Sequence, residues 1–262
     1  MSQEIKNKAA QINTAEAGWN SLYRLAGVGA LLSTLLVLVD IGMSFGGGDV
    51  GVAEMTTVNW FTLYQRDWFL GLRNLGLFNV ISTIISIPLY LVLYRLHRKA
   101  APAFAALALV VFLLGSAVYS SNNRALAMIT LSSQYAGAQT EVQRNIIEAA
   151  GTMTLAQAED FTPGTFLGFF LSSTGTIAMM AVMLRARIFG KKTSLAGLVG
   201  AACMLGFTIS VTFMPETMTL AMIPAMIGGL LMMGWNVSMA LAMFRMARPA
   251  VSQPARAAVL VP

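Results

Sequence analysis

Charge is scarce in this chain. Only 11% of its 262 residues are Asp, Glu, Lys or Arg, whereas 56% are hydrophobic; a soluble domain carries about 25% charged residues. A soluble surface needs more charge than this to cover so apolar a core, and a disordered chain needs a far more polar composition. Both classes are therefore excluded, and the apolar residues must face lipid. The length fits about six spans of roughly 20 residues each.

The residues that most often bind metals are scarce too. Cys203 is the only cysteine and His97 the only histidine, so no intramolecular disulfide can form, and zinc and haem sites lack ligands. No HExxH, GxSxG or Walker motif occurs. The sequence therefore predicts that the protein is not an enzyme and has no cofactor or metal.

Six apolar stretches are long enough, or nearly so, to cross a hydrocarbon layer about 30 Å thick. They run approximately over residues 25–43, 69–94, 102–119, 164–188, 194–213 and 218–243. They predict an all-α fold with a six-helix transmembrane domain over residues 25–247, between an N-terminal segment 1–24 and a tail 248–262. The longest connection, 120–163, contains two capping-box spacings, Thr140 with Gln143 and Thr154 with Gln157. These predict two short helices, near 141–150 and 155–159, in a small outer cap.

The basic residues are unevenly distributed along the chain. The two termini and the even-numbered connections hold 13 of the 17 Lys and Arg residues. By the positive-inside rule, both termini lie in the cytoplasm and the protein is multi-pass in a bacterial inner membrane. The net charge of +6 thus reflects the orientation of the protein in the membrane. Nucleic-acid binding is not expected, because no soluble basic domain is present.

The first outer connection, 44–68, begins with a flexible run, Gly46 to Gly48, and then becomes aromatic. An interfacial helix is predicted near 57–66. The aromatic residues at the position expected of an interfacial belt are Trp60, Phe61, Tyr64, Trp68 and Phe69. In the cap, Val142, Ile146 and Ala149 share one helix face, which suits packing on the bundle or on lipid headgroups.

Small and methionine-rich stripes occur in the later spans. Gly164, Gly168, Ser172 and Thr176 recur at four-residue intervals, and such stripes allow close helix contact in lipid. Smaller pairs are Gly197/Ala201, Ala202/Gly206 and Gly234/Ser238. Met214, Met218, Met222 and Met226 also recur every four residues; packing is favoured over Cu(I) binding, because no Cys or His joins them.

Two ionisable residues fall inside apolar stretches, where charge needs a partner. Asp40 and Arg73 both lie roughly 6–8 Å below the outer boundary, on consecutive spans, so they can meet. Asn74, Asn123 and Arg124 are expected at the same level, which makes these five residues the candidate ligand-binding site. Two interpretations remain open. The first is an ion pair that fixes helix register; the second is an outward-opening pocket that recognises a polar or anionic group.

Several short motifs appear in a recognisable order. They are Tyr-Arg-Leu-Ala-Gly at 23–27, Phe-Leu-Gly-Leu-Arg at 69–73, Leu-Tyr-Leu-Val-Leu-Tyr at 89–94, and a helical insertion before the fourth span. With these features, roughly residues 20–247 resemble an uncharacterised bacterial family of six-helix integral membrane proteins, domain-of-unknown-function family 4386. The resemblance implies the fold and an inner-membrane location, and it transfers no site.

Three functions are compatible with these observations. The first is binding or transport of a small polar solute or lipid headgroup through the outer cluster, and the three-plus-three arrangement of spans is that of many transporters. The second is a non-catalytic membrane subunit or regulator that binds a partner protein through its outer cap and small-residue faces. The third is an intramembrane enzyme, which would need a second carboxylate facing Asp40. An exposed Gly164/Gly168/Ser172 face would favour the second function.

Overall fold

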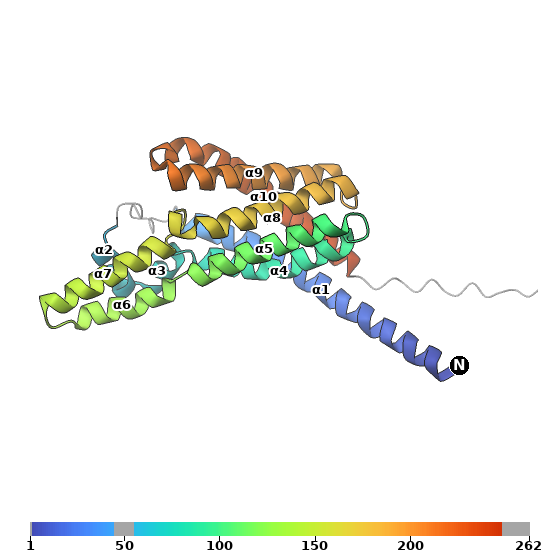
Figure 1. The fold of residues 1–262 in the computed structure, drawn as a ribbon, viewed down its shortest axis with the longest axis horizontal. Coiled ribbons are helices and arrows are strands. Elements are labelled where there is room, and N and C mark those ends of the chain that lie inside the picture. Colours follow the sequence, from blue (N-terminus) through green and yellow to red (C-terminus); the bar gives the residue numbers. More distant parts are fainter. Residues whose placement is uncertain (1, 45–54, 248–262) are drawn as a thin grey trace, which may run out of the picture.

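The computed structural model describes residues 2–44 and 55–247, and the regular structure within these ranges is entirely helical (Figure 1). Six helices are long and apolar enough to span a membrane. The spanning segments are α1 (Ser2–Met43), α4 (Leu77–His97), α5 (Pro102–Asn122), α8 (Pro163–Ala186), α9 (Lys191–Phe213) and α10 (Met218–Met246). The prediction of an all-α, six-span membrane protein is confirmed. The predicted tail 248–262 and the run Gly46 to Gly48 lie outside the described residues.

The spanning helices form a closed ring in the order α1, α4, α5, α8, α9, α10, with α10 packed against α1. Inside the ring, Met179, Met183, Trp235 and Met239 are fully buried. This methionine-rich interior lies toward the end of the bundle where α4 ends and α9 begins. The stripe from Met214 to Met226 instead faces outward, since all four of its methionines are exposed. Lipid contact therefore accounts for that stripe.

Proline and glycine determine several helix boundaries. Pro102 and Pro163 occupy the first turns of α5 and α8, where the missing N–H costs no hydrogen bond. The predicted second span is wrong as a single helix: two residues separate the end of α3 (Trp68–Asn74) from the start of α4. Gly76 separates them with a left-handed φ of 78°, a conformation that glycine adopts readily. Arg73 thus lies on a short helix preceding the span.

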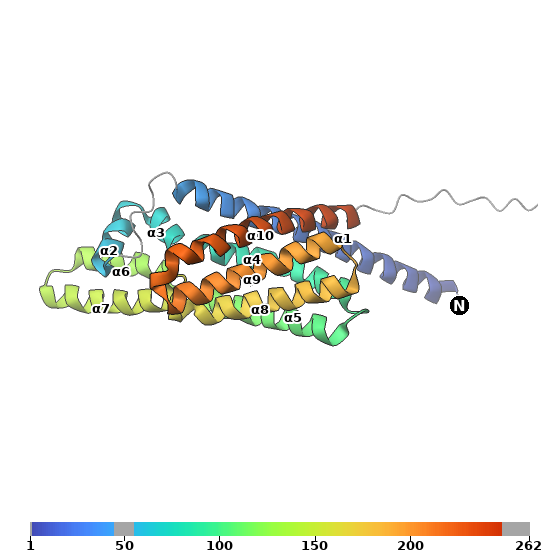
Figure 2. The same cartoon turned by 90° about the horizontal axis from the view of Figure 1, so that it is seen from above.

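The helical cap consists of α2 (Thr57–Arg66), α6 (Ala125–Gly137) and α7 (Glu141–Ala158). Figures 1 and 2 both show α6 and α7 extending past the ends of the spanning helices. The helix predicted at 57–66 and the Thr140–Gln143 capping box are confirmed. The prediction of two short helices is wrong, because α7 is continuous: the Thr154 hydroxyl donates to the Ala150 carbonyl within it.

Aromatic residues form the core of this cap. Trp60, Phe61 and Tyr64 are buried against α6 and α7, so assigning them to an interfacial belt was wrong. The Tyr64 hydroxyl donates to the Ala125 carbonyl at 3.1 Å, and burial raises the pKa of this phenol. Trp68 is exposed, as a residue of a membrane-interface belt would be.

The small-residue stripe of α8 is used inside the chain. A Cβ added at Gly168 would lie 2.8 Å from the backbone of Tyr119 on α5, and one at Gly164 would meet the backbone of Ala156 and Gln157 on α7. The expected close helix contact is therefore intramolecular. The Gly164/Gly168/Ser172 face is not exposed for a partner.

Candidate functional site

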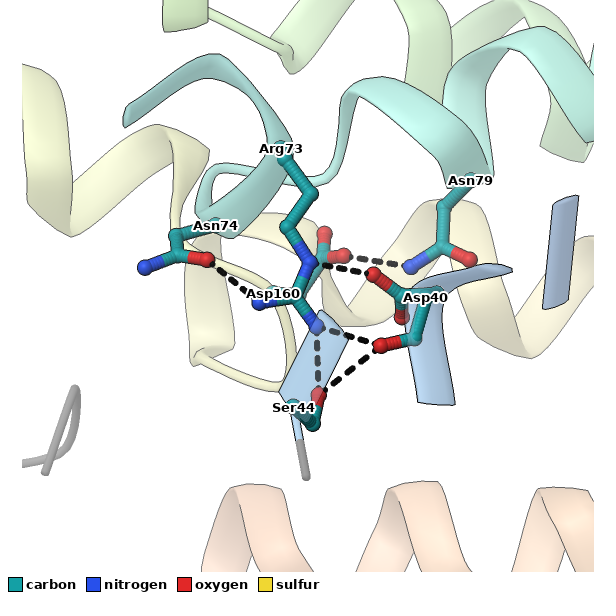
Figure 3. A network of polar contacts seen from close by, with 6 residues as sticks. All are labelled: Asp40, Ser44, Arg73, Asn74, Asn79 and Asp160. Carbon is teal, nitrogen blue, oxygen red and sulfur yellow. Dashed lines mark hydrogen bonds and ion pairs between the residues drawn. The ribbon is translucent and has the colours of Figure 1, made fainter. Parts of the chain in front are cut away.

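Asp40 and Arg73 meet at the cap end of the bundle, as their positions in the sequence predicted. The Arg73 Nε donates to Asp40 Oδ1 at 2.7 Å (Figure 3). Asp40 lies near the end of α1, and α3 brings Arg73 to it. The Arg73 residue is only 5% exposed, whereas the Asp40 side chain is 44% exposed. The pair is therefore buried on the side of its cation and accessible on the side of its carboxylate.

The other guanidinium nitrogens of Arg73 are also bound by the protein. Nη1 donates to Asn74 Oδ1 at 3.0 Å, and Nη2 donates to the Asp40 carbonyl at 2.7 Å and to the Ser44 hydroxyl. Figure 3 shows these acceptors surrounding the guanidinium. The Arg73 side chain thus ties the end of α1 to α3. Its donors are already occupied, which leaves little capacity to bind an incoming anion.

A second carboxylate, Asp160, lies beside this pair in the linker between α7 and α8 (Figure 3). Asn79 Nδ2 donates to Asp160 Oδ2 and the Tyr119 hydroxyl donates to Asp160 Oδ1, both at 2.7 Å. The carboxylates of Asp40 and Asp160 are close enough to interact electrostatically. The site thus gathers residues from α1, α3, α4, α5 and the α7–α8 linker.

Gly76 allows Asp160 to reach this position. A Cβ at Gly76 would lie 2.6 Å from Asp160 Oδ2 and 2.8 Å from the Tyr119 hydroxyl. Its left-handed φ interrupts the helical backbone between α3 and α4 at the same place. One glycine therefore both turns the backbone and opens the space for a carboxylate.

The remaining two predicted site residues behave differently. Asn123 Nδ2 donates to the Leu75 carbonyl at 2.7 Å, and its Oδ1 accepts from the Ala125 N–H at 3.2 Å. It thus joins the start of α6 to the α3–α4 turn, next to the cluster. The Arg124 side chain is exposed and makes no hydrogen bond or ion pair within the described ranges. The structure does not bring Arg124 into the cluster.

Sequence reasoning missed Asp160, Asn79 as its donor, and Tyr119. One signal was present: Glu159 and Asp160 closely precede Pro163, and a proline followed by an apolar run often starts a helix. That position puts both acids at the outer boundary of a span, level with Asn123 at the end of the preceding one. A second signal was Asn79, an amide side chain within an apolar stretch, in α4.

Acids outnumber bases in this cluster. Asp40 is paired with the one guanidinium, Asp160 lies beside this pair, and the half-buried Glu159 adjoins Asp160. Each carboxylate has about four acceptor positions; Asp160 uses two of them for Asn79 and Tyr119, and Asp40 Oδ2 accepts no hydrogen bond from the described residues. The described residues contain no group of three or more His, Cys, Asp or Glu arranged to hold a metal ion. The arrangement offers acceptors for a hydrogen-bond donor with positive charge.

The chain matches a known protein family. A family model described as Domain of unknown function (DUF4386) matches residues 66–259. No curated protein and no solved structure matches the chain. The matched range contains Arg73, Asn79, Tyr119 and Asp160, whereas Asp40 precedes it.

Proposed function

The chain belongs to the family described as Domain of unknown function (DUF4386), and we propose that this multi-pass membrane protein binds or transports a small solute or lipid headgroup that carries a primary ammonium group. The binding site is the outer cluster of Asp40, Arg73 and Asn74 together with Asp160. The family resemblance seen in the sequence is confirmed by the match. Because the family has no assigned activity, the ligand is inferred from the chain's own side chains.

The observation that carries this proposal is the charge balance of the cluster. In their ionised forms, two carboxylates and one guanidinium carry a formal net charge of −1, before Glu159 is counted. Every nitrogen of the Arg73 guanidinium already donates to a protein acceptor. An anionic ligand would thus meet two carboxylates and no available guanidinium donor. A cation instead offsets the excess charge in a region where uncompensated charge is costly.

Hydrogen-bond geometry favours a primary ammonium in particular. An ammonium group has three donors, and Asp40 Oδ2 and the unused lone pairs of Asp160 are acceptors on facing groups. The exposed side of Asp40 gives access from outside the bundle. A quaternary ammonium lacks N–H donors, so it would balance the charge but form no N–H hydrogen bond with the carboxylates. A binding role is proposed without catalysis. An aspartyl enzyme needs two carboxylates that share a proton, whereas Asp40 forms an ion pair with Arg73.

The distribution of basic residues supports an orientation for this site. We propose that the protein lies in a bacterial inner membrane with its basic residues and both termini in the cytoplasm, as the positive-inside rule predicts. The cluster then lies at the outer leaflet, where a soluble amine and a phosphatidylethanolamine headgroup can both approach.

Thermal unfolding of the purified protein tests the ligand and separates its two sources. Ethanolamine added in detergent tests a soluble amine, and nanodiscs of phosphatidylethanolamine against phosphatidylcholine with the same acyl chains test the headgroup. A ligand present at about 100 times its Kd stabilises the folded state by about 2.7 kcal/mol. We expect this stabilisation to raise the Tm. The rise is expected with ethanolamine if the natural ligand is a soluble amine, with phosphatidylethanolamine if it is a lipid headgroup, or with both if the site accepts both.

Two variants make this experiment specific. Asp160→Asn keeps the acceptor for Asn79 but removes the charge, and it is expected to abolish the rise in Tm. Glu216→Gln removes an exposed acid at the same end of the bundle, outside the cluster, and should keep it. An equal rise in Asp160→Asn and in the unaltered protein, or no rise with either source, would overturn the proposal.

A second function, partner binding through the outer cap, is favoured by one observation. Val142 and Ile146 on α7 are 68% and 64% exposed, in the part of the protein that projects past the spans (Figure 2). These two side chains do not pack on the bundle. The start of α7, which carries them, extends beyond the spanning helices. We expect a photoreactive side chain at position 146 to cross-link to one discrete protein in intact cells. The same probe at the exposed Phe104, near the opposite end, is the control; lipid products alone at both positions would exclude partner binding by this face.

A further inference from the structure

We propose that the other end of the molecule holds a second binding site, for an anionic phospholipid. The site is a groove of about 350 Å³ between the start of α9 and the last turns of α10. Its walls include Ile188, Thr193, Ser238, Met239, Leu241 and Arg245. The groove lies at what is called here the basic end, formed by residues 95–101, 185–193 and 244–247. It is independent of the ammonium site, which lies at the cap end and binds the opposite charge.

The charges around the groove favour an anion. Arg245 lines it, and the exposed Lys191 and Lys192 begin the helix that forms its other wall. Every acidic residue whose side chain is described lies at or beyond the cap end of a spanning helix. These residues are Asp40, Asp67, Glu141, Glu148, Glu159, Asp160 and Glu216. No described acid is therefore available near the groove to neutralise its basic residues.

The order of side chains along the groove corresponds to the order of groups in a phospholipid. Arg245 lies at the basic end, and Ser238 lies seven residues, or about 10 Å, deeper along α10. Between and beside them are the Thr193 hydroxyl and the apolar walls of Met239 and Leu241. Charge at the mouth, hydroxyl groups below it and apolar walls alongside suit a phosphate, ester groups and an acyl chain.

Two further features select lipid over a protein occupant. Ile188 and Leu241 line the groove and are exposed. Leu195, about one turn into α9, is exposed too. The surface around the groove is thus partly apolar, which suits contact with acyl chains. The N-cap of α9, Gly190, makes no side-chain capping bond, so the first N–H groups of this 23-residue helix add to the positive potential at the mouth. Basic pockets between helices at this membrane face bind anionic headgroups.

Native mass spectrometry with mixed lipids tests this site. The purified full-length protein is exposed to equal amounts of phosphatidylglycerol and phosphatidylcholine, and we expect phosphatidylglycerol to be retained preferentially. Arg245→Gln should weaken this retention about fivefold, which corresponds to about 1 kcal/mol per basic residue near anionic lipid. Lys99→Gln, an exposed charge at the same end but outside the groove, should leave it unchanged.

A variant that fills the groove separates a shaped site from general surface charge. Ser238→Phe keeps every basic residue and is expected to reduce phosphatidylglycerol retention as much as Arg245→Gln does; Thr193→Leu replaces it if the first variant does not fold. Retention that falls in Arg245→Gln but survives the filled groove would overturn the proposal, and so would equal losses in Lys99→Gln and Arg245→Gln. Asp160→Asn should retain phosphatidylglycerol normally, so failure at this site is distinct from failure at the ammonium site.

Discussion

Replacing Arg73 by alanine is expected to lower the free energy of unfolding by about 3–5 kcal/mol, toward the lower end because Asp40 is partly exposed. The change removes the cation that is paired with Asp40. It also leaves Asn74 Oδ1 without its donor, and the Asp40 carbonyl keeps only the Ser44 hydroxyl as a side-chain donor. The effect is measured as the loss of the folded, monodisperse fraction in detergent and as the fall in Tm.

Two further variants identify the cause of this loss. Arg73→Lys should recover only part of the stability, because one ammonium cannot reproduce the Nε and Nη geometry. Asp40→Asn combined with Arg73→Ala should be more stable than Arg73→Ala alone, since it removes one of the uncompensated charges. A protein that melts normally after Arg73→Ala would contradict a structural role for this side chain.

Replacing Gly115 by alanine is expected to be comparably damaging. The added Cβ would lie less than 3.0 Å from backbone atoms of Leu171 and Ser172 on α8, and backbone cannot move aside as a flexible side chain can. Overpacking of this kind costs about 1–3 kcal/mol and sometimes more. Intrinsic helix propensity works in the other direction, since alanine is favoured over glycine by about 1 kcal/mol. A fall in Tm would thus be attributable to the contact between α5 and α8.

Gly234→Ala is the matched control for this contact. Gly234 also lies inside a spanning helix, and a Cβ there would meet nothing within 4 Å. Its Tm is expected to be unchanged or slightly raised. Equal Tm values for the Gly115 and Gly234 variants would show that the close approach of α5 and α8 does not stabilise the fold.

Local patterns predicted much of this structure. Apolar length identified the six spans, the aromatic part of the connection 44–68 indicated α2, and the spacing of Thr140 and Gln143 identified a helix start. Each of these signals depends on residues within a few turns of one another. Capping energy and hydrophobic length are properties of a segment, so they can be read before the fold is known.

Features that depend on distant segments were harder to predict. Gly76 separates two helices inside an apolar run, and Asp160, over 80 residues later, occupies the space where a Cβ at Gly76 would lie. Trp60 and Phe61 suit a membrane interface by composition, but α6 and α7 bury them. Thr154 has the spacing of a cap, yet α7 continues through it because a hydroxyl can also bond to the preceding turn.

The prediction of the candidate site depended on two residues that were unusual in themselves, with Asn74 added as the neighbour of Arg73. Asp40 and Arg73 stood out as charges in apolar stretches, and their pairing followed from helix depth. The interpretations left open by the sequence now divide between its members. Arg73 has the contacts of a structural cation, whereas the carboxylates retain acceptor capacity for a ligand. The excess acid, on which the proposed function depends, became visible only with Asp160 in place.

The most direct test of the proposed function is infrared difference spectroscopy of the carboxylate bands as ethanolamine is added to the protein. The account predicts a shift in a carboxylate stretching band that saturates with ethanolamine, persists in Glu216→Gln and disappears in Asp160→Asn. Choline, which has no N–H donor, should produce a smaller shift at the same concentration. A spectrum that ethanolamine leaves unchanged, or a band shift that survives in Asp160→Asn, would contradict it.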